Sequence, residues 1–187
     1  MKRIFLTLAL LTNLGLACAL TFGLYIGNEG SASKLAEVQL RVHYHMLAGL
    51  GALTFATLLH AILFTYFMGT GRWLEETSKA YSLPDDYYKQ NQKIKYRLLP
   101  GLTMAVLMMV ATGGFGAAAD AATVVSLDGV MGMKGDQIHM LVAIFTAIVN
   151  ILVNFSEYIA VRRNHSIIEA VLADVRRIRE ERGLPVE

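Results

Sequence analysis

The sequence predicts an all-α integral membrane protein, a four-helix bundle with both ends of the chain on the same side of the membrane. Of its 187 residues, 55% are hydrophobic, and the mean hydropathy is +0.45. Both values lie above the range of ordinary soluble domains. The chain also contains long stretches with little charge, and about 20 apolar residues already cross the hydrocarbon of a bilayer. The four predicted spans are residues 4–26, 42–69, 98–119 and 136–161.

The first span follows Lys2 and Arg3 and continues without a convincing cleavage site, so we interpret it as a retained helix and not a signal peptide. The second span is expected to end near Gly69 and Gly71. Residues 72–97 are then predicted as a charged cytoplasmic loop of two short helices, divided at Pro84.

The distribution of basic residues predicts the orientation. Of the 17 Lys and Arg, two precede the first span, six lie in residues 72–97 and six follow Val161. The positive-inside rule places these regions and both termini in the cytoplasm, as expected for a multi-pass protein of a bacterial inner membrane. Residues 164–182 are predicted to form an amphipathic cytoplasmic helix, because Ile168, Val171, Val175 and Ile178 recur every three or four residues.

Several functional classes are excluded by what the sequence lacks. The single cysteine, Cys18, excludes an internal disulfide and a cysteine-cluster metal site. The basic residues are interleaved with acidic ones at helix ends, which argues against nucleic acid as a partner. The sequence contains no catalytic motif of the kind known from soluble enzymes, so it leaves open whether the protein is an enzyme.

Histidines in the second span are the main functional signal. A titratable side chain is costly in lipid, so it usually faces the bundle interior and often marks a site. Starting from His45, the same face of the helix carries Gly49, Ala52, Ala56 and then His60, about 22 Å further along. This strip of small residues leaves room for a flat group or a neighbouring helix.

His45 and His139 are predicted to lie at the same depth, near the outer ends of the second and fourth spans. The nearby half of the third span is almost entirely small, with Gly113, Gly114 and Gly116. Two imidazoles on different helices at one depth, with small residues beside them, favour axial ligation of haem b.

A second polar level is predicted around His60. It could ligate a second haem together with Met108, because His/Met ligation is known chemistry. Alternatively, His60 forms a hydrogen bond to Asn150 or Asn154 across the bundle, or joins Asn154 and Glu157 in a quinone or proton site. Asn150 and Glu157 share one face of the fourth span with His139, so this stripe should face the interior.

A competing interpretation places a transition metal at the outer surface. His43, Asp120 and Asp136 lie at or beyond the outer helix ends and could join His45 and His139 there. A mixed set of histidine and carboxylate ligands suits zinc, iron or copper. A protein without any cofactor is the third alternative.

Residues 64–75, FTYFMGTGRWLE, followed by YSLP at 81–84, resemble uncharacterised bacterial four-helix inner-membrane proteins. In its architecture the chain is also similar to the small cytochrome b anchor subunits of respiratory complexes. This second resemblance implies a haem between helices and contact with quinone.

The leading functional hypothesis is therefore a haem b-binding subunit that transfers electrons within a membrane complex. The alternatives are a non-catalytic structural or docking subunit and a membrane metal-binding protein with the outer His/Asp site. The expected partners are the lipid bilayer and either other membrane subunits or further copies of the chain.

Overall fold

The computed structural model describes residues 1–26 and 32–185, and over these residues the protein is all-helical, without a strand. The described long helices are α1 (Lys2–Ile26), α2 (Ala36–Tyr81), α3 (Asp86–Ala119) and α4 (Gly135–Glu181). A short 3₁₀ turn, η2 (Val130–Gly132), lies in the connection between α3 and α4. The predicted all-α fold is confirmed for this part of the chain.

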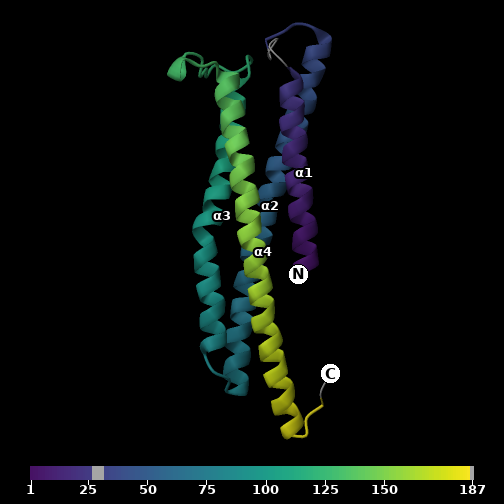
Figure 1. Cartoon of the computed structure of the whole chain (residues 1–187), viewed down its shortest axis with the longest axis vertical. Coiled ribbons are helices and arrows are strands. Elements are labelled where there is room, and N and C mark those ends of the chain that lie inside the picture. Colours follow the sequence, from purple (N-terminus) through teal and green to yellow (C-terminus); the bar gives the residue numbers. More distant parts are fainter. Residues whose placement is uncertain (27–31, 186–187) are drawn as a thin grey trace.

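The helices run side by side along one long axis (Figure 1). We call the end where α3 connects to α4 the upper end, and the end where α2 turns into α3 the lower end. α1 packs against α2 and α4, and α3 packs against the same two helices, while α2 and α4 face each other across the bundle with a smaller contact. Since α1 stops well above the lower end, the lower part consists of α2, α3 and α4 (Figure 1).

In the described chain, each of the helices α1 to α4 is long and apolar enough to cross a membrane. Their outward faces are hydrophobic, as a helix in lipid requires. On α4 alone the exposed large hydrophobic residues include Leu141, Ile144, Phe145, Ile148, Ile151, Leu152 and Phe155. A water-soluble helix would carry polar residues on such a face, so this surface indicates a multi-pass membrane protein.

The interior contains small apolar clusters separated by polar contacts. Phe5, Leu59, Leu63 and Phe67 belong to the middle cluster, which joins α1 to α2. Near the lower end, Leu74 of α2 packs with Ile167 and Val171 of α4 in a separate cluster. The polar side chains between these clusters define the candidate site.

The lower boundary of the second span differs from the prediction. α2 does not end at Gly69 and Gly71 but continues to Tyr81, where Ser82 adopts a left-handed conformation with φ of 54°. Gly71 is buried, and a Cβ there would lie 2.7 Å from Oδ1 of Asn91 on α3. These glycines therefore do not end the helix. At Gly71 the absence of a side chain lets α2 and α3 pack closely, and this packing can offset the cost of about 1 kcal/mol for glycine inside a helix.

Residues 72–97 contain two helical segments divided next to Pro84, as predicted, but these segments are the continuations of α2 and α3 and not separate short helices. The predicted helix over residues 164–182 is also present to Glu181, as the unbroken continuation of α4 from the fourth span.

Candidate functional site

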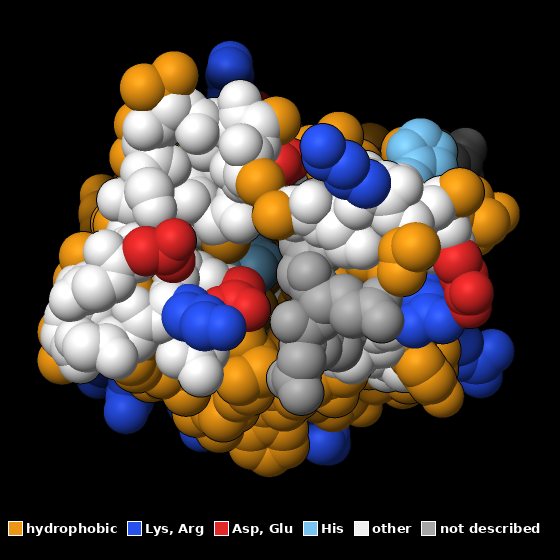
Figure 2. All heavy atoms as spheres, turned by 90° about the horizontal axis from the view of Figure 1, so that it is seen from above, with side chains coloured by type: hydrophobic (Ala, Val, Ile, Leu, Met, Phe, Trp, Pro, Cys, Tyr) orange, Lys and Arg blue, Asp and Glu red, His pale blue; other side chains and the backbone are white. Residues whose placement is uncertain are grey.

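The upper level of the bundle brings His45 of α2 and His139 of α4 together. Their ring centroids lie 5.9 Å apart, and the rings meet at 69°, close to an edge-to-face arrangement. Both side chains are half-buried. Because α2 and α4 face each other across the bundle, the two rings meet at its centre, and Figure 2 shows a histidine in a depression seen from the upper end.

His45 is oriented by α1. Its Nδ1 lies 2.9 Å from the backbone carbonyl of Ala19, which can only accept a hydrogen bond. Nδ1 therefore carries a proton, and in the neutral ring Nε2 keeps its lone pair. Gly23, one turn further along α1, borders the same ring, since a Cβ there would lie 3.0 Å from Cε1 of His45.

His139 has a matching environment on the other side of the bundle. A Cβ at Gly116 of α3 would lie 3.0 Å from Cε1 of His139. Nδ1 of His139 is buried and has no hydrogen-bond partner among the described residues. The backbone carbonyl of Thr112 interacts with the ring without forming a hydrogen bond of regular geometry. Each ring of the pair is thus bordered by a glycine from a neighbouring helix.

Between the upper and lower histidine levels, α3 and α4 are joined by two threonines. The hydroxyl groups of Thr112 and Thr146 lie 2.7 Å apart. Each hydroxyl can also donate to the backbone carbonyl of Met108 instead of to the other hydroxyl. The distances to this carbonyl are 2.9 Å from Thr112 and 3.3 Å from Thr146. Small polar side chains therefore hold α3 close to α4 below His139.

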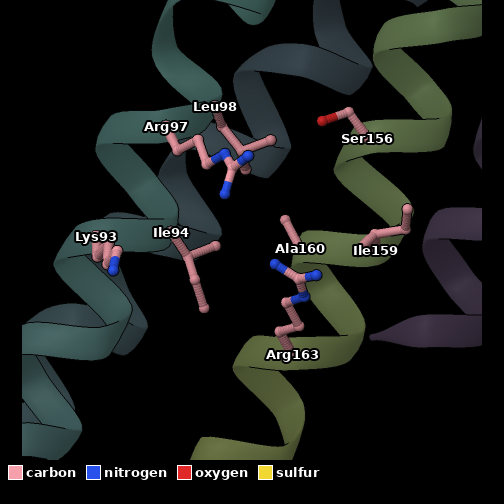
Figure 3. Close-up of a pocket in the computed structure, with 8 residues that line it drawn as sticks. All are labelled: Lys93, Ile94, Arg97, Leu98, Ser156, Ile159, Ala160 and Arg163. Carbon is pink, nitrogen blue, oxygen red and sulfur yellow. The ribbon is translucent and has the colours of Figure 1, made fainter.

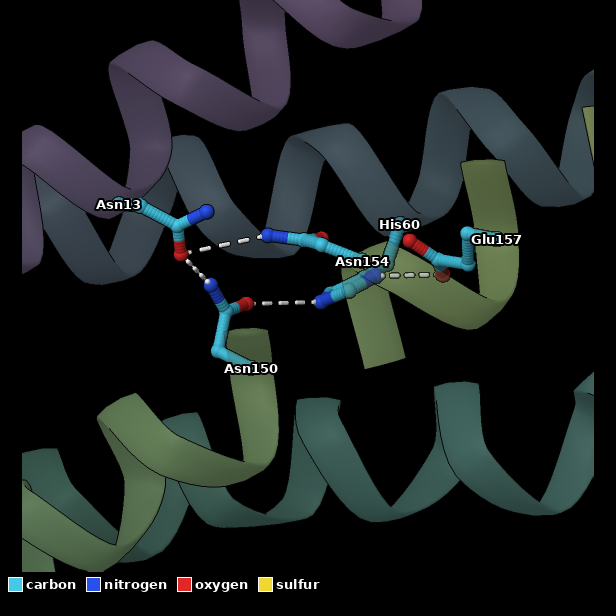
Figure 4. A network of polar contacts seen from close by, with 5 residues as sticks. All are labelled: Asn13, His60, Asn150, Asn154 and Glu157. Carbon is cyan, nitrogen blue, oxygen red and sulfur yellow. Dashed lines mark hydrogen bonds and ion pairs between the residues drawn. The ribbon is translucent and has the colours of Figure 1, made fainter. Parts of the chain in front are cut away.

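His60 is fully buried and is the centre of a second polar network (Figure 4). Its Nδ1 lies 2.8 Å from Oε1 of Glu157, and its Nε2 lies 3.2 Å from Oδ1 of Asn150. Asn150 in turn donates through Nδ2 to Oδ1 of Asn13 on α1, at 2.8 Å. Asn154 donates to the same oxygen at 3.4 Å. The network thus ties α1, α2 and α4 together.

The hydrogen bonds of this network define where its protons can lie. Since Nδ2 of Asn150 donates to Asn13, Oδ1 of Asn150 faces His60 and accepts a hydrogen bond from Nε2–H. The remaining proton lies between Nδ1 and the Glu157 carboxylate, so the pair is either two opposite charges or two neutral groups. In both arrangements the net charge is zero, which low-dielectric surroundings favour.

Two oxygens of the network have no partner among the described residues. They are Oε2 of Glu157 and Oδ1 of Asn154, both of them buried. A buried polar atom without a hydrogen bond costs free energy. This level therefore combines strong hydrogen bonds with two acceptor oxygens that are still free to accept one.

In the structure, His60 has other partners than the predicted Met108. Both ring nitrogens of His60 already have partners, which leaves neither for a haem shared with Met108. The predicted hydrogen bond from His60 to Asn150 is present, and Asn154 bonds to Asn13 instead.

Of the proposed outer metal ligands, His45 and His139 meet, but His43, Asp120 and Asp136 do not join them in a metal-binding group in the described chain. Asp120 accepts a hydrogen bond from the backbone of Ala122, and Asp136 accepts one from the backbone of Gln137. His43 is exposed next to Tyr44. Within residues 1–26 and 32–185, no group of three or more His, Cys, Asp or Glu side chains could hold a metal ion.

A third polar cluster, near the lower end, was not predicted from the sequence. Asn91 of α3 donates to Oδ1 of Asn164 on α4 at 2.7 Å. Asn164 donates to the hydroxyl groups of Tyr66 and Thr70 on α2, both at 3.0 Å. Two asparagines beside apolar helical stretches were the available signal, but their pairing depends on how α3 and α4 are aligned.

Comparison with known protein families, curated proteins and solved structures finds no match to this chain. The sequence resemblances described above therefore stay predictions. The fold and the site define a class by themselves: an all-helical protein with membrane-spanning helices, a histidine pair at one level of the bundle and a His/Glu/Asn network at another.

Proposed function

We propose that the protein is a membrane-embedded redox protein that binds haem b through His45 and His139 and passes electrons to a partner in the membrane. The observation that carries the proposal is the histidine pair, in which each imidazole lies so close to a glycine of a neighbouring helix that a Cβ there would come within 3.0 Å of the ring. When bound, haem would supply one-electron transfer at this level.

Three features support the fit of these residues to a haem. Nδ1 of His45 donates to a carbonyl, as is common for metal-binding histidines, and this leaves Nε2 as the ligand atom. The ring centroids are 5.9 Å apart, close to the value of about 6 Å for two imidazoles that bind one metal at about 2.0 Å each. Gly49, one turn from His45 on α2, has no atom within 4 Å of the position where a Cβ would lie, so this position next to the pair is open.

The uneven distribution of Lys and Arg supports an orientation with the lower end and both termini in the cytoplasm. In a bacterial inner membrane, the histidine pair would then lie near the periplasmic side. Labelling of single cysteines with a membrane-impermeant maleimide tests this orientation, with Cys18 first replaced by serine. A cysteine at Lys134 should react in intact spheroplasts, and one at Lys89 only after lysis. The reverse pattern contradicts the orientation.

The visible spectrum of the purified protein, oxidised and then reduced with dithionite, tests haem binding. We expect a Soret band and a sharp reduced α-band, and we expect His45→Ala and His139→Ala each to abolish them. His43→Ala is the matched control, because His43 is exposed and only two residues from His45. His60→Gln should also keep the bands, since the His60 ring belongs to the other network.

A protein that stays colourless after expression with a haem supply and after addition of hemin contradicts the proposal. Bands that persist in both His45→Ala and His139→Ala contradict the assignment of these ligands. Size-exclusion chromatography of each variant shows whether a lost band reflects a lost ligand or a lost fold.

A second candidate function is that of a structural or docking subunit. It is favoured by the lower end, where α2, α3 and α4 continue around their own apolar cluster of Leu74, Ile167 and Val171. Under this alternative, deletion of residues 164–187 would release the protein from a larger membrane complex and leave its spectrum unchanged. Under the haem proposal, the histidine variants change the spectrum whether or not a complex forms.

A further inference from the structure

A groove between α3 and α4 lies where their apolar stretches meet the charged lower end. It has a volume of about 260 Å³ (Figure 3). α3 contributes Lys93, Ile94, Arg97 and Leu98, and α4 contributes Ser156, Ile159, Ala160 and Arg163. The groove is separate from both histidine levels, since none of its lining residues belongs to them.

Three cationic side chains border this groove. Lys93 and Arg97 lie one turn apart on α3, and Arg163 extends from α4 toward the same space (Figure 3). None of the three forms an ion pair or a hydrogen bond with another described residue. In contrast, Arg72 and Lys79 on α2 each pair with a glutamate one turn away. The groove therefore carries a concentrated positive charge that the described chain does not neutralise.

The remainder of the lining is apolar, apart from one hydroxyl. The apolar lining residues are Ile94 and Leu98 of α3 and Ile159 and Ala160 of α4. The side chain of Ser156 extends from α4 toward α3 (Figure 3). Beyond Ser156, toward the upper end, the surfaces of the two helices stay hydrophobic. The exposed residues there include Met104, Leu107, Leu152 and Phe155.

We propose that this groove binds the phosphate of an anionic phospholipid such as phosphatidylglycerol. Lys93, Arg97 and Arg163 would contact the phosphate, and the acyl chains would lie along the hydrophobic surface toward Leu107 and Leu152. Basic pockets between membrane helices at the headgroup level have the right chemistry for this ligand. A soluble phosphate would use the same cations but would gain nothing from the adjoining apolar surface, so we commit to the lipid. The inference needs only that the helices span a bilayer, and it does not rest on haem binding.

Native mass spectrometry of the detergent-purified full chain, titrated with phosphatidylglycerol or phosphatidylcholine, tests the proposal. We compare the triple variant Lys93→Gln, Arg97→Gln, Arg163→Gln with the control Lys89→Gln, Lys95→Gln, Arg162→Gln. The control removes the same charge from neighbouring positions on the same helices, none of which lines the groove. Because three cations near the headgroup are removed together, the triple variant should lose about a hundredfold in affinity for phosphatidylglycerol.

Three results together support the proposal. The wild type prefers phosphatidylglycerol over phosphatidylcholine, and the triple variant loses that preference. The control keeps the ratio of the two affinities within about twofold of the wild-type value. Equal losses in the triple variant and the control would overturn it, because net charge alone would then explain binding. Displacement of the lipid by millimolar inorganic phosphate, with direct binding of phosphate to the wild type, would also overturn it and assign the groove to a soluble anion. Because all three side chains are exposed, the variants should fold, which circular dichroism checks.

Discussion

The two histidine levels use the same pair of helices in opposite ways. At the upper level, His45 and His139 meet each other, His45 contacts the backbone carbonyl of Ala19, and a glycine borders each ring. At the lower level, His60 is completely buried and has a side-chain partner at each ring nitrogen, Glu157 and Asn150. A histidine in a membrane helix therefore has no fixed role, since its partners decide whether a ring nitrogen stays available to a ligand.

The comparison also has an energetic side. His60 and Glu157 are both removed from water, which is costly unless each satisfies the other. The upper pair is half-buried and close to the helix ends, so its desolvation costs less. We therefore expect the lower level to contribute mainly to stability and the upper level mainly to function.

Glu157→Ala should have the largest effect on stability. It leaves His60 buried without its main partner, and breaking a buried pair of this kind costs about 3–5 kcal/mol. The free energy of unfolding in mixed micelles, measured by titration with sodium dodecyl sulfate, checks this value. Glu169→Ala is the control, because Glu169 is exposed and pairs only with His165, and it should change stability by less than about 1 kcal/mol. Equal effects of the two substitutions would contradict a structural role of the lower level.

Gly116→Leu should disturb the upper level. A side chain there must displace the His139 ring, because even a Cβ would lie 3.0 Å from it. We expect a loss of about 1–3 kcal/mol from overpacking, together with loss of the haem bands. The matched control is Gly114→Leu, since Gly114 lies on the same helix and has no atom within 4 Å of a Cβ position. If Gly116→Leu keeps a full complement of haem, the glycine does not shape the site.

Gly71→Ala extends the comparison to the third polar cluster, at Asn91 and Asn164. The added Cβ would lie 2.7 Å from Oδ1 of Asn91, so the amide must move and its hydrogen bond to Asn164 weakens. We expect a loss of about 1–2 kcal/mol in the free energy of unfolding. Gly69→Ala, two residues away with open space around it, should instead gain up to about 1 kcal/mol from helix propensity. A gain in both variants would show that Gly71 is not needed for close packing.

The smallest effect is expected for a second hydrogen-bonded pair, Tyr87 and Asp174, which is only partly buried. The hydroxyl of Tyr87 donates to Oδ2 of Asp174 at 2.7 Å, and Arg177 contacts the same carboxylate. The hydrogen bond from Tyr87, followed by that from Arg177, lowers the pKa of Asp174 below its ordinary value of 3.8. The same contact with Asp174, with a smaller part from burial, raises the pKa of Tyr87 above 10.0.

The signs of these two pKa shifts define a pH window. The lowered pKa of Asp174 means that its stabilisation is present above pH 3.8 and is lost as the pH falls through the lower folded value. The raised pKa of Tyr87 means that its stabilisation is complete below pH 10.0 and is lost at higher pH. Hydrogen exchange of the last turns of α4, corrected for intrinsic rates, should therefore accelerate in Tyr87→Phe at pH 6, and the acceleration should become smaller as the pH is lowered below 3.8. Tyr88→Phe is the control, and equal acceleration in both variants would contradict the role of this contact.

The sequence predicted the helices well because hydropathy along the chain is a local property. The long apolar stretches are visible without any knowledge of their neighbours, and all of them lie within described helices. The equal depth of His45 and His139 also followed from counting residues from the helix ends. The end of α2 was predicted wrongly at Gly69 and Gly71, because a glycine that stops a helix and one that permits close packing look the same in a sequence.

The candidate site depended more on the bundle. Periodicity placed Asn150 and Glu157 on one face of α4 but did not show that His60 would use both of its ring nitrogens there. Gly23 was not assigned to the site from the sequence, and the structure shows that it borders the His45 ring. The link between Asn91 and Asn164 was not predicted, because it depends on the relative rotation and shift of α3 and α4.

The sequence by itself determined that this chain forms long apolar helices with a few polar side chains at defined depths. Length, hydropathy and the 3.6-residue period are sufficient for that, since each acts within a single helix. Only the tertiary structure decided that α2 and α4 face each other across the bundle. That arrangement joins His45 to His139 and His60 to Glu157, because side chains on two helices meet only when the order and rotation of the helices bring their faces together.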